Sequence, residues 1–595
     1  MKSLTRVLLC STATTVLPAF SAGFLLPSQA AAQTACSGTL TLTAREITCL
    51  DGTAEVAVGT TETSTVIVPT AQGLATTSLF GEVVNLTPGA DGDTISTDIA
   101  GAHALNLQSA QALQLNAPDI NLVTTANNSV GLILTGTVLY PSTIGNISTS
   151  GDVSDGVRVT ANRIGLTTGD VSTTGADANA IELNGGTELT SITTGNLSAT
   201  GAGSQGLVSV SNGEFVGNLG NVTAANAGVT VDAGAGSIDL ETGSVSTTED
   251  FAQAVTLTAG GDIRFEGGAL STAGESADVL VATSGGALTA AADGITATGD
   301  LSDGAVLFAN GDLTADIGPI SVAGDDGSGI IAQSATGRIL INASNIATGG
   351  ATFSDAIDVT GTDSITVNAG NLTTVGDFSN GVIVNGGAGP IAVNVADVQT
   401  SGADSEGVEV YGTGGIDVLT GNITTTGDGS EGLLLSGGTD HVRAEFLDIA
   451  TSGVGSTGVD ITTAGDVEVE GGNVSTTADG TNAVQLTGNM ITGVLGGLSA
   501  SGVGSQALIV NASADVGLTV GDVTSSQDAI VVTSPTAVDL TTGNVNTTEA
   551  DAPGITVTSP DMINVTALNV NTDGDNSTGV IINGGAGDVT LTTAG

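Results

Sequence analysis

The chain has 595 residues, of which 61 are acidic and eight are basic, so its net charge at pH 7 is −53. Aromatic residues make up 2% of the sequence, which disfavours a large globular core built on rings, whereas aliphatic residues keep the hydrophobic share at 40%, more than acidic disordered chains contain. Nucleic acids and anionic membranes are bound through dense Lys/Arg patches, so this charge excludes both as partners.

Residues 1–32 have the pattern of a secretory signal peptide. Lys2 and Arg6 supply a positive start, an apolar stretch follows, and Ala30, Ala31 and Ala32 offer small residues for cleavage. A proline interrupts the apolar stretch, which disfavours a membrane anchor. We therefore expect an exported mature chain without lysine, whose only bases are Arg45, Arg158, Arg163, Arg264, Arg338 and Arg443.

Residues 33–92 are predicted to form an N-terminal cap and the first coils of a repeat domain. Cys36 and Cys49 lie in this segment, and two nearby cysteines in an oxidising compartment most often pair. We expect their disulfide to pin a small hairpin over the open first coil. A metal or redox pair is the alternative, which the absence of a nearby histidine and of a Cys-x-x-Cys spacing disfavours.

Residues 93–595 carry an internal repeat. A motif such as Gly145-Asn146-Ile147-Ser148-Thr149 returns every 22 to 26 residues, with looser copies at Asp93 and Ile120. A unit of about 25 residues cannot bury its own apolar face, so neighbouring units must cover each other. The recurrence therefore predicts one long stack of coils.

Each repeat contains three short alternating runs separated by Gly, Asn and Asp, as in the segment from Gly169 to Ile192. Such runs indicate strands of about four to six residues with turns between them. Because no amphipathic helical stretch separates the runs, we predict an all-β fold, a right-handed parallel β-helix of about 20 coils that forms a rod. The alternation should point Val171, Ile181 and Leu183 inward.

Two turn motifs accompany the strands. The second motif residue is often Asn or Asp, which tolerates unusual turn geometry and can hydrogen-bond from coil to coil; examples are Asn146, Asp170, Asn196, Asn371, Asn422, Asn473 and Asn544. A Gly-Asp-x-Ser-x-Gly motif precedes an apolar strand in copies that begin at Gly151, Gly299, Gly376, Gly427 and Gly574. We expect its glycine to adopt positive φ and its Asp or Ser to cap free amides.

No residue pattern predicts catalytic residues or a cofactor-binding motif. The two histidines, His103 and His441, lie many coils apart, and no pair of carboxylates stands out from the repeat. Calcium is the most plausible ligand, because stacked carboxylates repel and an ion bound by several oxygens relieves that repulsion. Its weak candidates, on corresponding turns of nearby coils, are Asp300, Asp325, Asp326, Asp377 and Asp428. We expect the turn carboxylates to be solvated and screened by salt, with no cofactor, and calcium is the alternative.

One outward column is rich in hydroxyl groups. The fourth and sixth residues of the motif should share a face; examples are Ser148/Ser150, Ser172/Thr174, Ser198/Thr200, Thr296/Thr298, Thr424/Thr426 and Ser475/Thr477. A flat array of this kind resembles ice-binding proteins, although Ala347, Val375 and Gln399 interrupt it. The preference of Ser and Thr for these strand positions explains the pattern equally well.

The signal peptide, the Cys36/Cys49 pair and the Gly-, Asn-, Thr- and Val-rich coils together resemble the passenger region of Gram-negative autotransporters. The resemblance implies a secreted protein of the cell surface or outer membrane that acts without catalysis in adhesion or cell-surface interaction. Its partners would be host or neighbouring-cell surface molecules or polysaccharide. Autotransporters end in a C-terminal β-barrel, which this sequence does not contain. We therefore expect a truncated repeat domain that would meet the membrane only through that barrel.

Three alternatives stay open. Parallel β-helices also include polysaccharide-degrading enzymes, which would place clustered, non-repeated carboxylates on one flank. A cation-stabilised S-layer or matrix protein would use the acidic turns, and an ice-binding protein would use the hydroxyl column.

Overall fold

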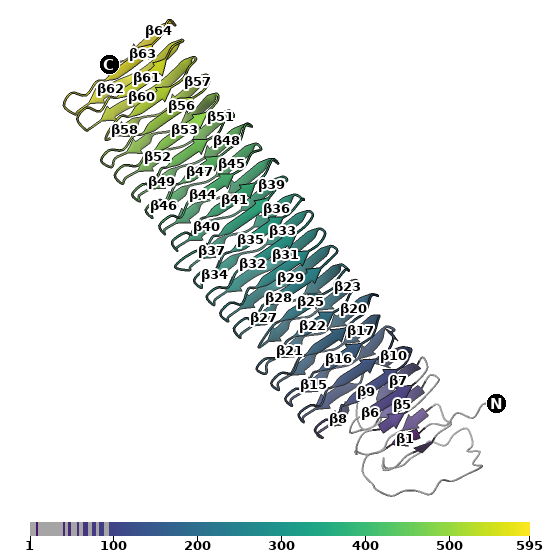
Figure 1. Cartoon of the computed structure of the whole chain (residues 1–595). Helices are drawn as coiled ribbons and strands as arrows, with labels where there is room; N and C mark the ends of the chain where they lie inside the picture. The colour runs from purple at the N-terminus through teal and green to yellow at the C-terminus, as the bar shows by residue number, and fades with distance from the viewer. Residues whose placement is uncertain are drawn as a thin grey trace. The chain divides into compact units, whose positions relative to one another are not determined.

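A computed structural model of the chain describes residues 94–594 and short strand segments before them (Figure 1). The predicted signal peptide, apart from the short strand β1, and the Cys36–Cys49 pair lie outside the described residues. The chain divides into two compact units, unit 1 (residues 1–286) and unit 2 (residues 287–595). In the part of the chain that the structure describes, no helix is long and apolar enough to cross a membrane.

The predicted fold is confirmed: the chain is a right-handed parallel β-helix of about 20 coils with a spacing of about 25 residues. One coil of unit 1 consists of an a strand, β16 (Val157–Thr160), a b strand, β17 (Ile164–Thr168), and a c strand, β18 (Val171–Thr173). Within each unit the a strands of successive coils pair in parallel in one sheet, and the b and c strands pair in a second sheet.

The remaining strands of unit 1 follow this pattern. Before residue 94 the strands are β1 (Val7–Leu9), β2 (Leu40–Thr41), β3 (Glu46–Thr48), β4 (Val56–Val58), β5 (Ser64–Val68), β6 (Leu74–Ser78) and β7 (Glu82–Pro88). The other a strands are β9 (Leu105–Ser109), β12 (Leu132–Thr135), β19 (Ile181–Asn184), β22 (Leu207–Val210), β25 (Val229–Asp232), β28 (Val255–Ala259) and β30 (Leu280–Ser284). The other b and c strands are β8 (Thr94–Thr97), β10 (Ala112–Ala117), β11 (Asn121–Thr124), β13 (Val138–Leu139), β14 (Ser142–Ile144), β15 (Ile147–Thr149), β20 (Thr190–Thr194), β21 (Leu197–Ala199), β23 (Phe215–Leu219), β24 (Val222–Ala224), β26 (Ile238–Thr242), β27 (Val245–Thr247) and β29 (Ile263–Thr272).

Unit 2 repeats the same coil. Its a strands are β32 (Ala305–Ala309), β35 (Ile330–Ser334), β38 (Ile357–Gly361), β41 (Val382–Gly386), β44 (Val408–Tyr411), β47 (Leu433–Ser436), β50 (Val459–Thr462), β53 (Val484–Gly488), β56 (Leu508–Ala512), β59 (Ile530–Thr533), β61 (Ile555–Ser559) and β63 (Val580–Gly584). Its b and c strands are β31 (Leu288–Ala297), β33 (Leu313–Ile317), β34 (Ile320–Val322), β36 (Ile339–Ala343), β37 (Ile346–Thr348), β39 (Ile365–Ala369), β40 (Leu372–Thr374), β42 (Ile391–Val395), β43 (Val398–Thr400), β45 (Ile416–Thr420), β46 (Ile423–Thr425), β48 (Val442–Phe446), β49 (Ile449–Thr451), β51 (Val467–Gly471), β52 (Val474–Thr476), β54 (Ile491–Leu495), β55 (Leu498–Ala500), β57 (Val516–Val520), β58 (Val523–Ser525), β60 (Val538–Thr547), β62 (Ile563–Thr572) and β64 (Val589–Thr593).

The core of each unit is a stack of aliphatic side chains. Val171, Ile181 and Leu183 are buried, as the alternation predicted. The strand register places Ile181 beside Val157 of the preceding coil and beside Leu207 of the following coil. Each buried aliphatic side chain stabilises the fold by about 1.5–3 kcal/mol. The core therefore needs no large aromatic residues, because every coil covers its neighbour with side chains of similar shape.

Buried hydroxyl groups close many of the turns between a c strand and the next a strand. At the end of β18, Oγ1 of Thr173 donates a hydrogen bond to the carbonyl of Ala178 (2.6 Å). In unit 2 the backbone N–H of Ser379 donates to Oγ of Ser405 (2.9 Å), and that Oγ donates in turn to the carbonyl of Gly376 (3.0 Å). These hydroxyls satisfy turn amides and carbonyls that no strand pairing reaches.

Positive φ in these turns falls on the residue after the aspartate, which is a glycine, as we expected, in the copy at 427 (Gly429, 66°) but not in the copies at 151, 299 and 376. In the Gly-Asp-x-Ser-x-Gly copies at 151, 299 and 376, the residue with positive φ is the variable one, namely Val153 (56°), Leu301 (56°) or Phe378 (54°). The first glycine serves close packing instead, because a Cβ on Gly151 would lie 2.0 Å from the carbonyl oxygen of Ala126. Left-handed geometry costs a non-glycine residue about 1–2 kcal/mol.

Ser405→Ala removes the hydrogen bonds of one buried hydroxyl and leaves the amide of Ser379 without its acceptor. We expect the free energy of unfolding to fall by about 1–3 kcal/mol, the usual cost of an unsatisfied buried polar group. Urea unfolding followed by circular dichroism measures the change. The half-buried Ser499 supplies the control, since Ser499→Ala should leave the unfolding midpoint in place; equal effects of both variants would contradict a structural role for the buried hydroxyl.

Candidate functional site

The Asn and Asp residues of the repeat motif form the predicted ladder between coils. The backbone N–H of Asp170 donates to Oδ1 of Asn146 (2.9 Å), and the N–H of Asn196 donates to Oδ1 of Asp170 (2.7 Å). In unit 2 the N–H of Asn371 donates to Oδ1 of Asn345 (2.9 Å). These side chains hold the corner between the b and c strands, so they are structural parts of the coil.

The candidate calcium ligands lie in a second ladder at the turn after the c strand. Oδ1 of Asp300 accepts the N–H of Asp325 (3.1 Å), whose own Oδ1 accepts the N–H of Ala351 (2.7 Å). Asp377 and Asp428 accept the N–H groups of Ala403 and Val454 in the same way, and Oδ1 of Asp326 accepts the Oγ1–H of Thr352; the three bonds are 2.8, 2.8 and 2.5 Å long.

The expected stack of neighbouring carboxylates is therefore incomplete. Asp300 and Asp325 occupy the same position in consecutive coils. In the next coil, however, that position is apolar: Ala351 follows Asp325, Ala403 follows Asp377, and Val454 follows Asp428. Alternation with apolar residues relieves the repulsion that we expected an ion to relieve. Within residues 94–594 no group of three or more His, Cys, Asp or Glu side chains is arranged to hold a metal ion.

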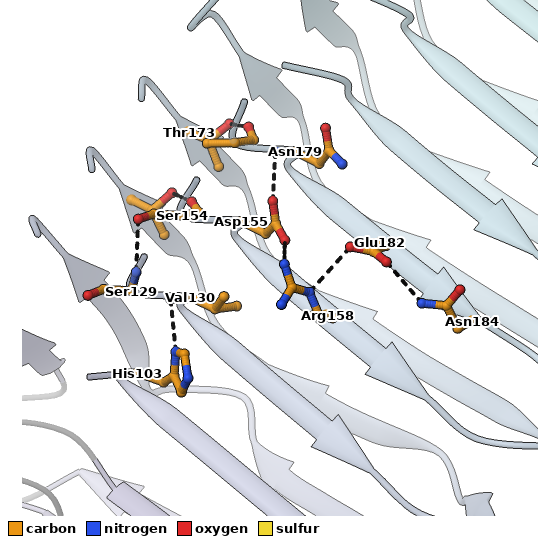
Figure 2. Close-up of polar contacts among 12 residues, drawn as sticks. His103, Ser129, Val130, Ser154, Asp155, Arg158, Thr173, Asn179, Glu182 and Asn184 are labelled. Carbon is orange, nitrogen blue, oxygen red and sulfur yellow. Dashed lines mark hydrogen bonds and ion pairs between the residues drawn. The ribbon is translucent and has the colours of Figure 1, made fainter. Parts of the chain in front are cut away.

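A third ladder precedes the a strands and includes one of the two histidines (Figure 2). Nδ1 of His103 accepts the N–H of Val130 (3.1 Å). Asp155 occupies the same position two coils after His103, and its Oδ1 accepts the N–H of Asn179 (2.9 Å). Histidine, aspartate and asparagine thus do the same work here, since each offers one acceptor atom to the next coil.

Asp155 is also the buried partner of an arginine. Its side chain is 4% exposed and forms an ion pair with Arg158, whose Nε lies 3.3 Å from Oε2 of Glu182 (Figure 2). Burial raises the pKa of Asp155, and the neighbouring guanidinium of Arg158 opposes that rise. The ion pair gives the buried carboxyl group a cationic partner, which makes Arg158 a stabilising residue of unit 1.

The hydroxyl column is more regular in unit 1 than the sequence suggested. The strand register aligns one outward hydroxyl from the c strand of each of six consecutive coils. These residues are Ser148, Ser172, Ser198, Thr223, Ser246 and Ser271. All six are half-buried or exposed. In unit 2 the same column contains Ala347, Gln399 and Ala450, so it is interrupted there.

Unit 2 contains a carboxylate cluster, defined as Asp355, Asp358, Glu406, Glu409, Glu431 and Asp460, on the a strands and the turns that precede them. The register places Asp358, Glu409 and Asp460 at the same strand position in alternate coils. Nδ2 of Asn380 donates to Oε2 of Glu409 (2.8 Å), and the hydroxyl of Tyr411 donates to Oε1 of Glu409 (2.5 Å). Acidic residues far apart in the sequence are thereby brought together.

The cluster holds protons near neutral pH. Burial raises the pKa of Asp355 to about 7, and the charges of Asp358 and Glu409 add to the rise. Burial likewise raises the pKa of Glu406 to about 8, helped by Glu409 and Glu431. The Glu406 carboxyl group also interacts with the side chain of Glu431, which contributes to the raised pKa of Glu406. A carboxylic acid beside a carboxylate is the chemistry of an acid–base pair.

Sequence reasoning missed this cluster, although a signal was present. Glu406 and Glu431 occupy the ladder position that Asp155 and Asn179 occupy in unit 1, and Asp155 alone has a nearby arginine. Alignment of the repeats by that position would have shown acidic residues recurring in unit 2 without a matching base. The surrounding repeats hid the pattern, because isolated acids at turns are common throughout the chain.

Arg158→Ala should destabilise unit 1, because it leaves the buried Asp155 carboxylate without its cation. We expect a loss of about 1.5–3 kcal/mol, typical of a hydrogen bond to a charged group. Asp155→Asn in the same chain should restore stability, since Asn179 shows that an amide fits this position. Arg338→Ala is the matched control: its exposed ion pair with Asp312 should contribute nothing measurable. Calorimetric melting of the unchanged chain, Arg158→Ala, the double variant and Arg338→Ala measures these differences in stability. A double variant no more stable than Arg158→Ala would contradict the pairing of Arg158 with Asp155.

The raised pKa of Glu406 predicts a stability that depends on pH. The folded protein binds a proton up to a pKa of about 8, whereas the unfolded chain releases it near 4.5. Stability should therefore fall as pH rises through this window, by roughly 1–3 kcal/mol between about pH 5 and pH 8.5. Glu406→Gln, which removes the proton but keeps a hydrogen-bonding group facing Glu409 and Glu431, should flatten the dependence. The exposed Glu468→Gln should leave the slope of melting temperature against pH unchanged; an unaltered slope in Glu406→Gln would refute the assignment.

No protein-family model, curated protein or solved structure matches the chain. The resemblance to autotransporter passengers therefore stays a prediction. Three places where the repeat is unusually regular or is broken are the candidate functional features. They are the hydroxyl column of unit 1, the carboxylate cluster of unit 2 and the left-handed turns that carry bulky apolar residues.

Proposed function

We propose that the chain is an exported, non-catalytic protein of the Gram-negative cell surface that acts in adhesion or cell-surface interaction. Its partners would be host or neighbouring-cell surface molecules or polysaccharide. The observation that supports this proposal best is the column of six aligned hydroxyls in unit 1.

The column offers the same pair of groups, a hydroxyl donor and a hydroxyl acceptor, once per coil. Parallel strands lie about 4.8 Å apart, so the hydroxyls form a regular row along one face of the unit. One such hydrogen bond contributes only about 0.5–1.5 kcal/mol. Contacts that are repeated along one ligand reinforce each other, because each later contact forms at a high effective concentration.

The polar groups of the ladders are unavailable for such contacts, since they already bond the next coil. Asn146, Asp170 and Asn196 each accept a backbone N–H from the following coil. Within the hydroxyl column itself, Oγ of Ser246 lies 3.4 Å from Oγ1 of Thr223, at the long end of a hydrogen bond. The column therefore remains available for contacts outside the chain, whereas the ladder groups are committed to the neighbouring coil.

Removal of the column should weaken binding more steeply than in proportion to the number of hydroxyls lost. We expect Ser172→Ala alone to reduce retention on a panel of polysaccharides and intact bacterial and animal cells by about twofold. The triple variant with Ser198→Ala and Thr223→Ala should reduce it by about tenfold or more, as multivalent binding requires. Beads that carry the purified full chain, washed under flow, give the measurement.

The control changes an outward column of the b strands in the same three coils. Thr167, Thr193 and Asn218 are exposed and aligned with one another, and their replacement by Ala should leave retention unchanged. Equal losses in both triple variants, or no loss in the hydroxyl variant, would refute the proposal. Thermal hysteresis of the purified protein, abolished by the hydroxyl triple variant, would favour the ice-binding alternative instead.

A further inference from the structure

Unit 2 exposes two neighbouring phenylalanines on its turns. Phe353 and Phe378 follow the c strands of consecutive coils and are 60% and 48% exposed. Their ring centroids lie 5.1 Å apart and their planes differ by 11°, so the rings are stacked. Val375, in the same turn as Phe378, is also exposed. Together these three side chains form an apolar patch, which we name the phenylalanine patch.

The backbone at this patch is strained. Phe353 and Phe378 have φ values of 47° and 54°, in the left-handed region. The coils on either side place Asp326 and Asp404 at the corresponding position, and the coil after Asp404 places Gly429 there. Aspartate and glycine adopt this geometry more readily than phenylalanine. Exposed phenylalanines at positive φ gain little from burial and weaken the coil, so their presence points to a contact outside the chain.

The surroundings of the phenylalanine patch are negatively charged. Asp325, Asp326, Asp377 and Asp404 are exposed on the same row of turns. The two arginines of unit 2 lie just before β36 (Arg338) and in β48 (Arg443). Both are already paired, Arg338 with Asp312 and Arg443 with three carboxylates. The full chain has 61 acids and eight bases, so the patch also lies in a strongly acidic molecule.

We propose that the phenylalanine patch binds an arginine-rich, partly apolar peptide segment of a partner protein. A guanidinium group stacks on aromatic rings and pairs with carboxylates, whereas the ring surface itself covers aliphatic side chains. The exposed rings would contact the aliphatic side chains of such a segment, and the row of aspartates would pair with its arginines. This site is separate from the hydroxyl column, so it stands whether or not the column binds a ligand.

Fluorescence anisotropy with the full chain and a labelled arginine–leucine peptide tests the proposal, in about 150 mM salt, where the Debye length is about 8 Å and distant charges are screened. Phe353→Gly with Phe378→Gly should weaken binding by about tenfold or more. The fold should survive, because glycine favours the backbone geometry of both positions. Phe251→Gly is the matched control: Phe251 has φ of 60° and is 69% exposed in unit 1, and its loss should change affinity by less than about twofold.

Two further comparisons separate the proposal from its competitors. A peptide with citrulline in place of arginine should bind about tenfold more weakly, as should the arginine peptide to a chain with Asp325→Asn and Asp377→Asn, which keep the Oδ1 acceptors of the ladder. Equal binding of the citrulline peptide would overturn the proposal in favour of a purely apolar contact. Binding that is insensitive to the double glycine variant would also overturn it, as would a concentration-dependent dimer that this variant abolishes.

Discussion

Every coil of this protein must satisfy the backbone of its neighbour, and the rest of the structure depends on that constraint. Parallel pairing places each residue beside the equivalent residue of the next coil, as Val157, Ile181 and Leu207 show. Any side chain that fits its position in one coil therefore meets a near copy of itself in the next. Aliphatic residues gain from this arrangement because they stack without gaps, and carboxylates lose because they repel.

In the turns, side-chain acceptors meet the same constraint by bonding backbone amides of the neighbouring coil. Amides that leave the strands still need partners, and a single oxygen or nitrogen from the neighbouring coil supplies one. His103 and Asp155 occupy the same ladder although their chemistry differs, because only the acceptor atom matters there. The Asn/Asp residues at the corner between the b and c strands and the Asp residues after the c strands are consequently parts of the coil, and repetition is the reason that they recur.

Residues that do not fit this repeated pattern distinguish structural positions from candidate functional ones. The buried Asp155 has a compensating arginine, so it belongs to the stability of unit 1. The groups that shift the pKa of Glu406 include no arginine, and burial beside other carboxylates raises that pKa to about 8. Phe353 and Phe378 have no compensation within the coil, since both are exposed and both adopt left-handed geometry. An uncompensated feature of this kind is the best guide to an external partner in a chain of repeats.

Local patterns in the sequence determined the coil itself: three strands, the inward faces of Val171, Ile181 and Leu183, and the Asn/Asp ladder at the corner. These features follow from alternation and turn chemistry within about 25 residues, which a repeat displays many times over. Only the tertiary structure decided which residue of the Gly-Asp-x-Ser-x-Gly turn takes positive φ, because the first glycine is required by the neighbouring coil. It also decided that Glu406 meets Glu431 and that Phe353 stacks on Phe378, since such contacts depend on the register between coils whose spacing varies.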